Sequence, residues 1–430
     1  MKNELREILS AALEAADPGE AVRRYLNVED GKILAADASF EPRRVFVLAA
    51  GKAACAMARA AEELLGDRVS GGLVVTKDGN ETPLERLEVV LSSHPEPDER
   101  GVEAARRVAE LAESLEEGDL LLALISGGAS ALLADPAPPI ELADLKKLTG
   151  DLLRSGASID EINAVRKHVS MLKGGGLVRS AAPADTLALL LSDVVGDDLS
   201  SIASGLTAPD PTTLQDVERI VRRYDLKLPE SVRDHLDGAP ETPEPGDPVF
   251  ERVTNLLVGG GRLTSEAAAE KASDLGYEPL ILSTYVTGQA RNVAGLYAAI
   301  VREVRDSGNP LQPPCAIISG GEATVVVRGD GVGGPNQEFA LALAVELEGV
   351  ESWAAFAVDT DGNDGPTDAA GGMVDGETAK TIRESGLDPL EALDDNDTYK
   401  ALSAAGALIQ TGPTGTNVND LRVVLLAAPK

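Results

Sequence analysis

The chain has 430 residues, of which 43% are hydrophobic, 26% charged and 3% aromatic. This composition is globular, which excludes a wholly disordered chain and a membrane bundle, and the length predicts two or three domains. Asp and Glu (71) outnumber Lys and Arg (39), giving a formal net charge of −32. Such a surface repels nucleic-acid phosphates and anionic lipids, so nucleic-acid and membrane partners are excluded.

The excess of acidic residues also predicts a salt-loving source. High net charge opposes compaction unless salt screens it, and at ~1 M salt the Debye length is about 3 Å. We expect a soluble, cytoplasmic protein that loses ellipticity on desalting. The only cysteines, Cys55 and Cys315, imply no disulfide framework. The N-terminus has no signal h-region, and no apolar run approaches membrane-spanning length.

Helical spacing and short apolar runs alternate along the chain. Apolar residues recur at helical spacing over 3–14, 53–65, 101–116 and 141–154. Continuous apolar runs occur at Val45–Ala50, Leu120–Ile125, Leu187–Leu191, Leu256–Val258, Ala316–Ile318 and Ala354–Val358. Short apolar runs between helices predict parallel strands buried on both faces, and therefore an α/β layered fold.

A proline-rich segment predicts the boundary between two domains. Residues 236–249 read LDGAPETPEPGDPV, and four prolines among acids and glycines cannot form a helix or a central strand. We therefore predict an N-terminal domain over 1–236, a linker over 237–249 and a C-terminal domain over 250–430.

Each apolar run leads into a polar or glycine-rich turn. These turns are Gly51-Lys52, Ser126-Gly127-Gly128, Ser192-Asp193, Gly259-Gly260-Gly261-Arg262, Ser319-Gly320-Gly321-Glu322 and Asp359-Thr360-Asp361-Gly362. In open α/β sheets ligands bind beyond the carboxyl ends of the strands, and glycines there let backbone N–H groups approach a phosphate. Tight turns alone are the alternative for any single loop, but six such loops favour the binding of small anions.

Two groups of cations could contact such an anion. Lys52 follows a strand and a glycine, but VLAAGKAA (47–54) lacks the spacing of a P-loop. A solvated lysine at a turn is an equal alternative. Ser158 and Glu161 form a capping box that predicts a helix to about Leu172. Its polar face and the following turn carry Arg166, Lys167, Lys173 and Arg179, which favours anion binding over a solvated basic face.

Two sets of carboxylates could supply a base or hold a metal. Asp193 ends the most apolar run, where a carboxylate can accept a hydroxyl proton or bind a metal; capping the next helix is the alternative. Asp359, Asp361, Asp364 and Asp368 form an acidic cluster without the pattern of an EF-hand. Mg²⁺ held by one or two carboxylates and substrate phosphates fits better, against the alternative of an acidic turn without metal.

Other chemistries lack their required residues. The three histidines have no zinc-helix spacing and there is no Cys-x-x-Cys, which excludes a structural zinc site. No Gly-x-Ser-x-Gly elbow is present, so a hydrolase triad has no anchor. A dinucleotide fingerprint after a predicted strand is also absent, which argues against the use of NAD.

Eight motifs in this order resemble glycerate 2-kinases of the MOFRL type. They are AAGKAA (49–54), HPEPDERG (94–101), SGGASALL (126–133), INAVRKHVSMLKGG (162–175), LSDVVGDDLSSIASG (191–205), GGPNQEFALA (333–342), DTDGNDGPTDAAGG (359–372) and TGPTGTNVNDL (411–421). The resemblance implies ATP-dependent phosphorylation of D-glycerate to 2-phosphoglycerate with Mg²⁺ or another divalent cation. It also implies a Rossmann-like three-layer N-terminal domain, a smaller α/β C-terminal domain and an active site in the cleft between them.

The resemblance assigns roles to individual residues. Lys52 and Asp193 are expected to be catalytic, as the phosphate-contacting lysine and the base. Substrate binding is expected of Ser126, Gly127, Gly128, Ser130, Arg166 and Lys167. Nucleotide binding is expected of Gly260, Gly261, Arg262, Asn336, Gln337, Glu338, Asn417 and Asn419, and metal binding of Asp359 and Asp361.

Four positions depart from the family pattern. Ala129 replaces a glycine, Leu206 a proline, Gln289 a glutamate and Pro335 an arginine; Arg262 or Arg291 could replace the cation lost at 335. Two other functions remain open: a hydroxypyruvate reductase using NAD(P)H, and a non-catalytic sugar-acid or nucleotide-binding protein. The oligomeric state is not determined by the sequence, and a homodimer is one candidate.

Overall fold

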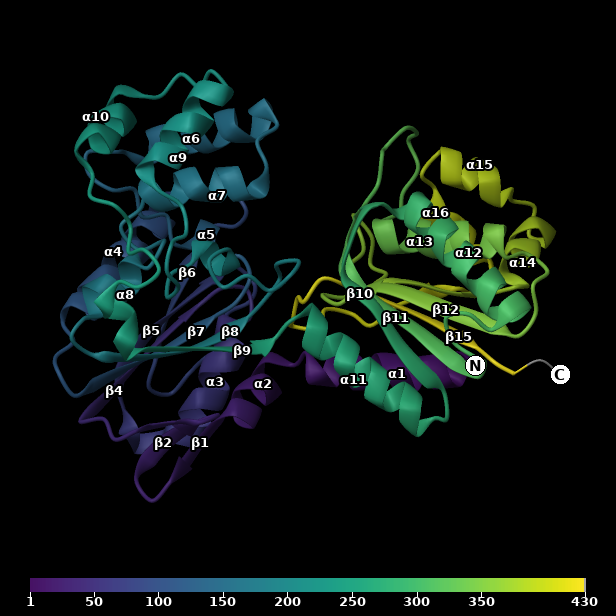
Figure 1. Ribbon diagram of the computed structural model, residues 1–430, viewed down its shortest axis with the longest axis horizontal. Coiled ribbons are helices and arrows are strands. Elements are labelled where there is room, and N and C mark those ends of the chain that lie inside the picture. Colours follow the sequence, from purple (N-terminus) through teal and green to yellow (C-terminus); the bar gives the residue numbers. More distant parts are fainter. Residues whose placement is uncertain (429–430) are drawn as a thin grey trace. The chain divides into compact units, whose positions relative to one another are not determined.

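The computed structural model describes residues 1–428, which divide into two compact units. The parallel-sheet unit spans Pro18–Val258, and the mixed-sheet unit combines Met1–Asp17 with the chain from Gly259 onward. Both are α/β, as predicted (Figure 1). Within the described residues no helix is both long and apolar enough to cross a membrane.

The parallel-sheet unit contains a six-stranded sheet with the order β6-β5-β4-β7-β8-β9. Its strands are β4 (Arg44–Ala50), β5 (Val69–Lys77), β6 (Glu88–Ser92), β7 (Asp119–Ile125), β8 (Asp185–Leu191) and β9 (Val253–Gly259). The pairs from β6 through β8 are all parallel. Every residue of β7 is buried, as a central strand covered on both faces requires.

Helices cover both faces of this sheet. One face contacts α3 (Ala54–Leu65), behind which lies α2 (Pro18–Tyr25), and the other packs against α4 (Glu99–Glu113) and α8 (Gly176–Ala181). A separate helical layer has its own apolar core and consists of α6 (Leu142–Ser155), α7 (Ile159–His168), α9 (Leu214–Arg223) and α10 (Glu230–Gly238). Short elements complete the unit: β1 (Leu26–Glu29), β2 (Lys32–Ala35), β3 (Ala38–Phe40) and α5 (Ala129–Leu132).

The mixed-sheet unit has a six-stranded sheet with the order β10-β11-β15-β12-β13-β14. The strands are β10 (Glu278–Gln289), β11 (Cys315–Thr324), β12 (Trp353–Asp359), β13 (Gly371–Asp375), β14 (Leu408–Ile409) and β15 (Asp420–Leu426). Only β10 and β11 pair in parallel, and the remaining pairs are antiparallel. The expectation that 316–318 and 354–358 form parallel strands is therefore wrong for β12, and for β11 on the side of β15.

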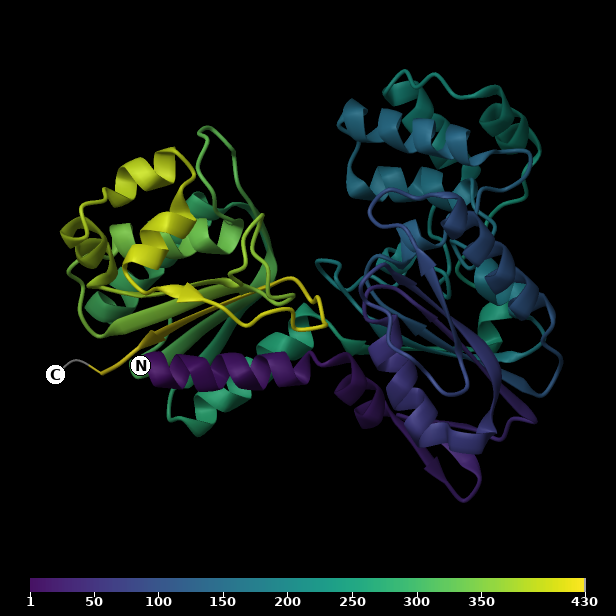
Figure 2. The ribbon, with the colours of Figure 1, turned by 180° about the vertical axis from the view of Figure 1, so that it is seen from behind.

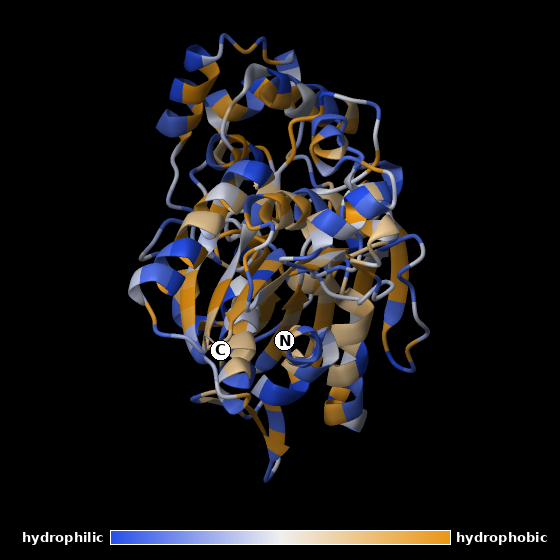
Figure 3. Ribbon diagram, turned by 90° about the vertical axis from the view of Figure 1, so that its right-hand side faces the viewer, coloured by the Kyte–Doolittle hydropathy of each residue, from blue (hydrophilic) through white to orange (hydrophobic). Residues whose placement is uncertain are grey.

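This sheet also lies between two layers of helices. One apolar core joins it to α1 (Lys2–Ala15) and α11 (Gly261–Asp274), which lie side by side in Figure 2. The other core joins it to α12 (Ala290–Ser307), α13 (Pro335–Glu346), α14 (Thr378–Glu384), α15 (Pro389–Asp394) and α16 (Thr398–Ala404). In Figure 3 the strands carry mostly hydrophobic colours and the helices alternate, as layers with one solvated face require.

The chain divides at residues other than those predicted from the proline-rich segment. Residues 237–249 pack within the parallel-sheet unit, where Thr242 Oγ1 donates to Asp210 Oδ2 at 3.0 Å and a Cβ on Gly175 would lie 3.1 Å from Pro243. The chain then adds β9 to the parallel sheet before it crosses at Gly259. The first 17 residues belong to the mixed-sheet unit because α1 buries Leu5, Ile8 and Ala12 there. Prolines prevented regular structure but did not mark a domain boundary.

Candidate active site

The turns after β4 and β7 are joined by direct hydrogen bonds in the parallel-sheet unit. Lys52 N donates to Gly127 O at 2.9 Å, and Ala53 N donates to Ser126 Oγ at 3.1 Å. Gly51 makes this approach possible, because its φ is +130° and a Cβ there would lie 2.2 Å from Ser126 Oγ. Ser126 is itself buried, and its side chain joins the two turns.

The third turn, after β8, places Asp193 directly over Gly127. A Cβ at Gly127 would lie 2.0 Å from Asp193 Oδ2, so only glycine fits at this position. Burial raises the pKa of the Asp193 carboxyl, and the charge of Lys52 partly opposes this shift. Lys52, Gly127 and Asp193 therefore lie together at the carboxyl edge of the sheet.

His94 is a fourth member of this cluster that the residue-by-residue prediction missed. A Cβ at Gly128 would lie 3.1 Å from His94 Nε2 and 3.3 Å from Lys52 Cγ, so both side chains flank this glycine. Burial, followed by the charges of Lys52 and Lys77, lowers the pKa of His94. His94 follows β6, so the same strand-end rule would have found it had 88–92 been identified as a strand.

A small pocket next to this cluster contains the cation Arg166. Ser130, Thr149, Ser170 and Arg166 contribute polar groups to its lining. Burial lowers the pKa of Arg166, and no carboxylate within residues 1–428 forms an ion pair with it. Ser130 exchanges a hydrogen bond of 2.8 Å with Ser204. A half-buried guanidinium without a counter-charge, beside hydroxyl groups, can bind a carboxylate or phosphate.

Lys167 has a different position from the one predicted. Its helix, α7, begins with the predicted capping box of Ser158 and Glu161 but ends at His168, earlier than expected. Lys167 is buried, and its Nζ lies 3.2 Å from Asp210 Oδ1. Lys173 is likewise buried and paired with Asp135. These two cations stabilise the unit internally, because separating either from its carboxylate would leave a buried charge unpaired.

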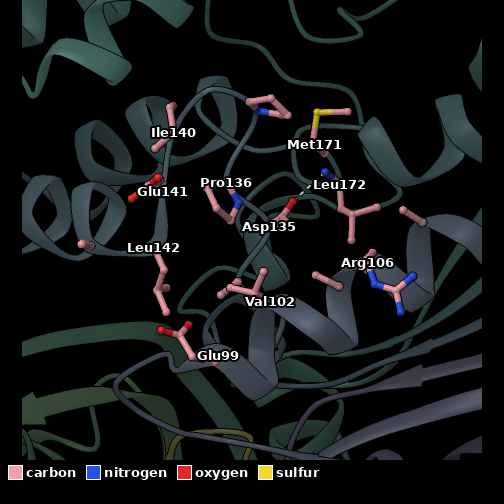
Figure 4. Close-up of a pocket in the computed structure, with 15 residues that line it drawn as sticks. Glu99, Val102, Arg106, Asp135, Pro136, Ile140, Glu141, Leu142, Met171 and Leu172 are labelled. Atoms are coloured by element: carbon pink, nitrogen blue, oxygen red, sulfur yellow. Dashed lines mark hydrogen bonds between the residues drawn. The ribbon is translucent and has the colours of Figure 1, made fainter.

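A groove of the parallel-sheet unit adjoins the Arg166 pocket, and the two share Ala134 and Asp135. It has a volume of about 590 Å³ between α4 and the 134–142 segment, and apolar side chains such as Val102, Ile140 and Met171 line most of it (Figure 4). Asp135 lines both spaces, but its carboxylate is occupied by Leu172 N and Lys173. None of the predicted catalytic side chains lines this groove.

The mixed-sheet unit places Asp359 and Asp361 at the end of β12. Asp361 N donates to Asp359 Oδ1 at 3.0 Å, and burial and then the charge of Asp361 raise the pKa of Asp359 to about 8. No Lys or Arg among the described residues pairs with either carboxylate. Within the same residues no group of three or more His, Cys, Asp or Glu side chains is arranged as a metal site. Two uncompensated oxygen donors suit a hard divalent cation that takes its other ligands from water and phosphate.

The other two aspartates of this acidic cluster have structural partners. Asp364 is buried and accepts hydrogen bonds from Asn336 N at 3.0 Å and Gln337 N at 2.8 Å, so it caps the N-terminus of α13. Its pKa is raised to about 6, chiefly by burial. Asp368 is exposed and accepts a hydrogen bond of 2.7 Å from Tyr399.

Asn336, Gln337 and Glu338 are interior residues, although nucleotide binding was predicted for them. All three are buried in the first turn of α13. Asn336 Nδ2 donates to Asp420 at 2.7 Å, and Glu338 accepts hydrogen bonds from Arg291 and Asn396, each at 3.2 Å. These polar groups join α13 to the sheet and to its neighbouring helices. The sequence could not show this, because a polar run at a helix start is equally typical of a ligand site.

Two of the predicted nucleotide-binding segments and the predicted metal-binding loop lie together in the mixed-sheet unit. A Cβ on Gly261, at the start of α11, would lie 3.6 Å from Val418 O. Val418 N donates to Thr360 Oγ1 at 2.9 Å, and Thr360 N donates to Asn419 O at 3.2 Å. The N-terminus of α11, the 417–419 loop and the carboxylate loop therefore meet. Three further predicted residues lie in these segments, Gly260, Arg262 and Asn417.

One departure from the family pattern, Pro335, has a local explanation in the structure. Pro335 occupies the first turn of α13, where a missing N–H costs nothing. Arg291 is engaged with Glu338 and Asp394, so it is not available as a replacement cation. Arg262, at the start of α11, is 65% exposed and makes one surface ion pair, with Glu266 at 3.8 Å. Surface pairs of this kind are weak, so Arg262 remains available to bind another anion. The predicted turn Ser319–Glu322 is part of β11, where a Cβ on Gly321 would lie 2.1 Å from Val286 O, so this glycine serves close strand pairing.

The fold and these clusters define a two-unit α/β protein with cation-rich and carboxylate-rich strand ends, suited to anionic small molecules. A domain of unknown function, DUF4147, matches residues 4–237, and the MOFRL family matches residues 315–420. The chain belongs to the MOFRL-type glycerate 2-kinase family.

Relatives that match over nearly the full length of the chain support this assignment. The chain is 42% identical to a glycerate 2-kinase of Pyrococcus horikoshii, with 99% of this chain and 98% of that protein covered. It is 43% identical to a D-glycerate 2-kinase of Thermotoga maritima, with 98% and 97% covered. It is also 44% identical to an Agrobacterium vitis protein with the provisional name hydroxypyruvate reductase, with 98% and 94% covered.

Two solved structures with the same fold support the same assignment. A crystal structure of a Pyrococcus horikoshii OT3 protein matches with a TM-score of 0.90 at 42% identity, covering 100% of this chain and 99% of that one. The crystal structure of a Thermotoga maritima glycerate kinase matches with a TM-score of 0.91 at 42% identity, covering 99% of each chain.

Proposed function

We propose that this protein transfers the γ-phosphoryl group of ATP to the 2-hydroxyl of D-glycerate, giving 2-phosphoglycerate and ADP. The observation that carries the proposal is the cluster of Asp193, Lys52 and His94 around Gly127 and Gly128. It combines a base, a cation and glycine backbone at one sheet edge. Phosphoryl transfer needs positioning and charge neutralisation more than it needs a covalent nucleophile. The cluster supplies groups for both positioning and charge neutralisation.

Asp193 is the proposed base. The substrate hydroxyl oxygen attacks the γ-phosphorus, the bond to the ADP oxygen breaks, and the hydroxyl proton passes to the Asp193 carboxylate. Burial raises the pKa of this carboxyl above its ordinary value, which makes it a stronger base than an exposed aspartate. Gly127 keeps the space into which this carboxylate projects.

Lys52 is the proposed partner of the transferred phosphoryl group. Its backbone is held by Gly127 O, and Asn80 Nδ2 donates to Lys52 O at 2.8 Å. The stem of its side chain lies next to Gly128 and close to His94. His94, whose pKa is lowered, stays neutral near pH 7 and can donate a hydrogen bond to the same anion without competing for its charge.

Arg166 is the proposed partner of the glycerate carboxylate. Its guanidinium has no protein counter-charge in the described residues, and Ser130 follows Gly127 and Gly128 into the same pocket. A planar guanidinium can bind a carboxylate through two parallel hydrogen bonds. Binding there would fix the orientation of the substrate relative to Asp193.

The mixed-sheet unit supplies the proposed contacts to nucleotide and metal. The N-terminus of α11 has free N–H groups, with Arg262 beside them, and suits a phosphate of ATP. Asp359 and Asp361 would hold Mg²⁺, which neutralises phosphate charge when bound. The 417–419 loop is proposed to contact the nucleotide through Asn417, the more exposed of its two asparagines.

The direct test is ADP release from ATP, Mg²⁺ and D-glycerate at ~1 M KCl, where surface repulsion is screened, with the product then given to enolase. Conversion by enolase without added mutase identifies 2-phosphoglycerate. ADP release without an enolase substrate would place the phosphoryl group on another carbon. If the folded protein releases no ADP but oxidises NAD(P)H in the presence of hydroxypyruvate, the kinase proposal is wrong and the reductase name is right.

A further inference from the structure

Asn163 is a buried residue of α7 whose side-chain amide is only half used by the protein. The residue is 7% exposed, and Ser204 Oγ donates to its Oδ1 at 3.5 Å. Its Nδ2 makes no hydrogen bond within residues 1–428, yet it is not one of the fully enclosed side-chain atoms that lack a partner, so it borders accessible space. Because an unpaired buried donor is costly, this amide is placed to bind a group from outside the chain.

The surroundings of this amide connect it to the Arg166 pocket. Residues three apart on a helix lie on one face, with Cβ atoms about 5–6 Å apart, so Asn163 and Arg166 share a face of α7. The Ser204 hydroxyl that contacts Asn163 also exchanges a hydrogen bond of 2.8 Å with Ser130 Oγ. Ser130 lines the same pocket as Arg166. A neutral amide and two hydroxyl groups therefore adjoin the cation.

The backbone around Ser204 fixes the position of its hydroxyl. Ala203 and Ser204 both have left-handed conformations, with φ of +51° and +58°, which residues other than glycine rarely adopt. Such strain persists where the surrounding structure holds it, and here Gly174 N donates to Ser204 O at 3.0 Å. Ser204 is also buried. It is therefore a positioning residue, which holds Asn163 and Ser130 at a set separation.

We propose that Asn163 and Ser130 bind the 3-hydroxyl group of the substrate and so select 2-hydroxy acids that carry a hydroxymethyl group. This inference rests on the proposed phosphorylation of D-glycerate, which has three polar groups. Its carboxylate is assigned to Arg166 and its 2-hydroxyl to Asp193, so the neutral 3-hydroxyl has no assigned partner. A neutral amide beside the cation matches a neutral hydroxyl beside a carboxylate.

The donors and acceptors of this subsite form a closed ring with a bound hydroxyl group. Asn163 Nδ2 donates to the substrate oxygen, and the substrate hydroxyl donates to Ser130 Oγ. Ser130 then donates to Ser204 Oγ, and Ser204 donates to Asn163 Oδ1. A hydroxyl is both a donor and an acceptor, so it completes the ring, whereas a methyl group would leave the amide and Ser130 unpaired. Connected hydrogen bonds of this kind strengthen one another.

A substrate that lacks only the 3-hydroxyl tests this subsite. D-Lactate has a methyl group where D-glycerate has the hydroxymethyl group. For the wild type we expect kcat/KM for ADP release to be at least ~10²-fold higher with D-glycerate, because D-lactate leaves buried polar groups unpaired. Asn163→Ala is expected to lower kcat/KM for D-glycerate by about 10- to 100-fold and to change that for D-lactate by less than about 3-fold.

The ratio of the two values of kcat/KM separates binding from structure, since a variant that only disturbs the fold lowers both equally. Asn255 is the matched control, because the protein engages its whole amide: Oδ1 accepts from Thr207 Oγ1 at 2.7 Å and Nδ2 donates to Thr207 O at 2.9 Å. Asn255→Ala is expected to leave the ratio unchanged. Ser130→Ala tests the subsite from α5, should Asn163→Ala fail to fold, and should also lower the ratio.

Two results would overturn this assignment while the phosphorylation of D-glycerate stands. One is an equal kcat/KM for both acceptors in the wild type. The other is a preference for D-glycerate that persists at full size in Asn163→Ala and Ser130→Ala. A folded wild-type protein that releases no ADP with either acceptor would instead contradict the proposed function, and the subsite with it.

Discussion

The parallel and mixed sheets differ in which segments meet at the ends of their strands. In the parallel sheet, β4, β7 and β8 run the same way, so the turns that follow them lie at one edge and Lys52, Gly127 and Asp193 meet. In the mixed sheet, β11 and β12 also run the same way, but β15 lies between them and runs against both, so the start of β15 at Asp420 separates their ends. Strand order and strand direction together therefore decide which segments meet at one edge of a sheet.

The largest effect should come from the cluster in the parallel sheet. Asp193→Asn and Lys52→Ala are each expected to lower kcat by ~10²–10⁴ or more, because one removes the base and the other the phosphate-binding cation. The acid limb of the pH profile should lie above the range of an ordinary aspartate and disappear in Asp193→Asn, since a base is active only when deprotonated. Steady-state kinetics across pH measure both effects.

The conservative control for this comparison is Asp67→Asn, at a carboxylate that is 96% exposed. It is expected to retain wild-type kinetics. Near-wild-type turnover in Asp193→Asn or Lys52→Ala would mean that the chemistry takes place elsewhere.

The next effect tests whether catalysis depends on the close approach of the Asp193 carboxylate to Gly127. Gly127→Ala places a methyl group 2.0 Å from the present position of Asp193 Oδ2, so the carboxylate must move. We expect kcat to fall by ~10², the loss typical of a displacement of about 1 Å. Gly238→Ala, where a Cβ meets nothing within 4 Å, is the control. Equal kinetics in the two variants would contradict the assigned position of Asp193.

A smaller effect separates binding from chemistry. Arg166→Gln is expected to raise KM for glycerate by about 10- to 100-fold, from the loss of a charge-assisted hydrogen bond, with a lesser change in kcat. Arg154→Gln removes a guanidinium that is 73% exposed and should not alter KM. If instead kcat falls and KM is unchanged, Arg166 is not a carboxylate-binding residue.

The carboxylate loop provides the corresponding test in the mixed sheet. Asp359→Asn and Asp361→Asn are each expected to raise the Mg²⁺ concentration needed for half-maximal activity by about 10-fold or more. Asp368→Asn changes an exposed aspartate of the same loop and should leave the Mg²⁺ dependence unchanged. An identical Mg²⁺ requirement in all three variants would contradict the assignment of the metal site to this loop.

The smallest effect is on stability and has the opposite sign to the effect on rate. Because the pKa of Asp193 is higher in the folded than in the unfolded protein, its contribution to stability is present at low pH and is lost as the pH rises through the folded value. Asp193→Asn should therefore unfold at a higher denaturant concentration than wild type at pH 7. The difference should shrink toward acid pH, and a less stable Asn variant at pH 7 would contradict the assigned burial.

The sequence predicted the candidate site more accurately in the parallel sheet than in the mixed sheet. In the parallel sheet, continuous apolar runs identified β4, β7, β8 and β9, and the strand-end rule led from them to Lys52, Gly127 and Asp193. His94 was missed because β6 is short and half-exposed. In the mixed sheet the same rule led to Asp359 and Asp361, but also to Ser319–Glu322, which turned out to be strand.

Composition, apolar periodicity and motif order by themselves determined the α/β class, the family and the residues most suited to chemistry, because these properties depend on local spacing. Tertiary structure alone decided which of these residues are available to a ligand. Lys167 pairs with the distant Asp210, and Asn336 with Asp364 and Asp420, whereas Arg166 has no such partner among the described residues. A polar side chain takes a structural role when folding brings a partner from a distant part of the sequence next to it. Local sequence spacing does not show whether such a partner exists.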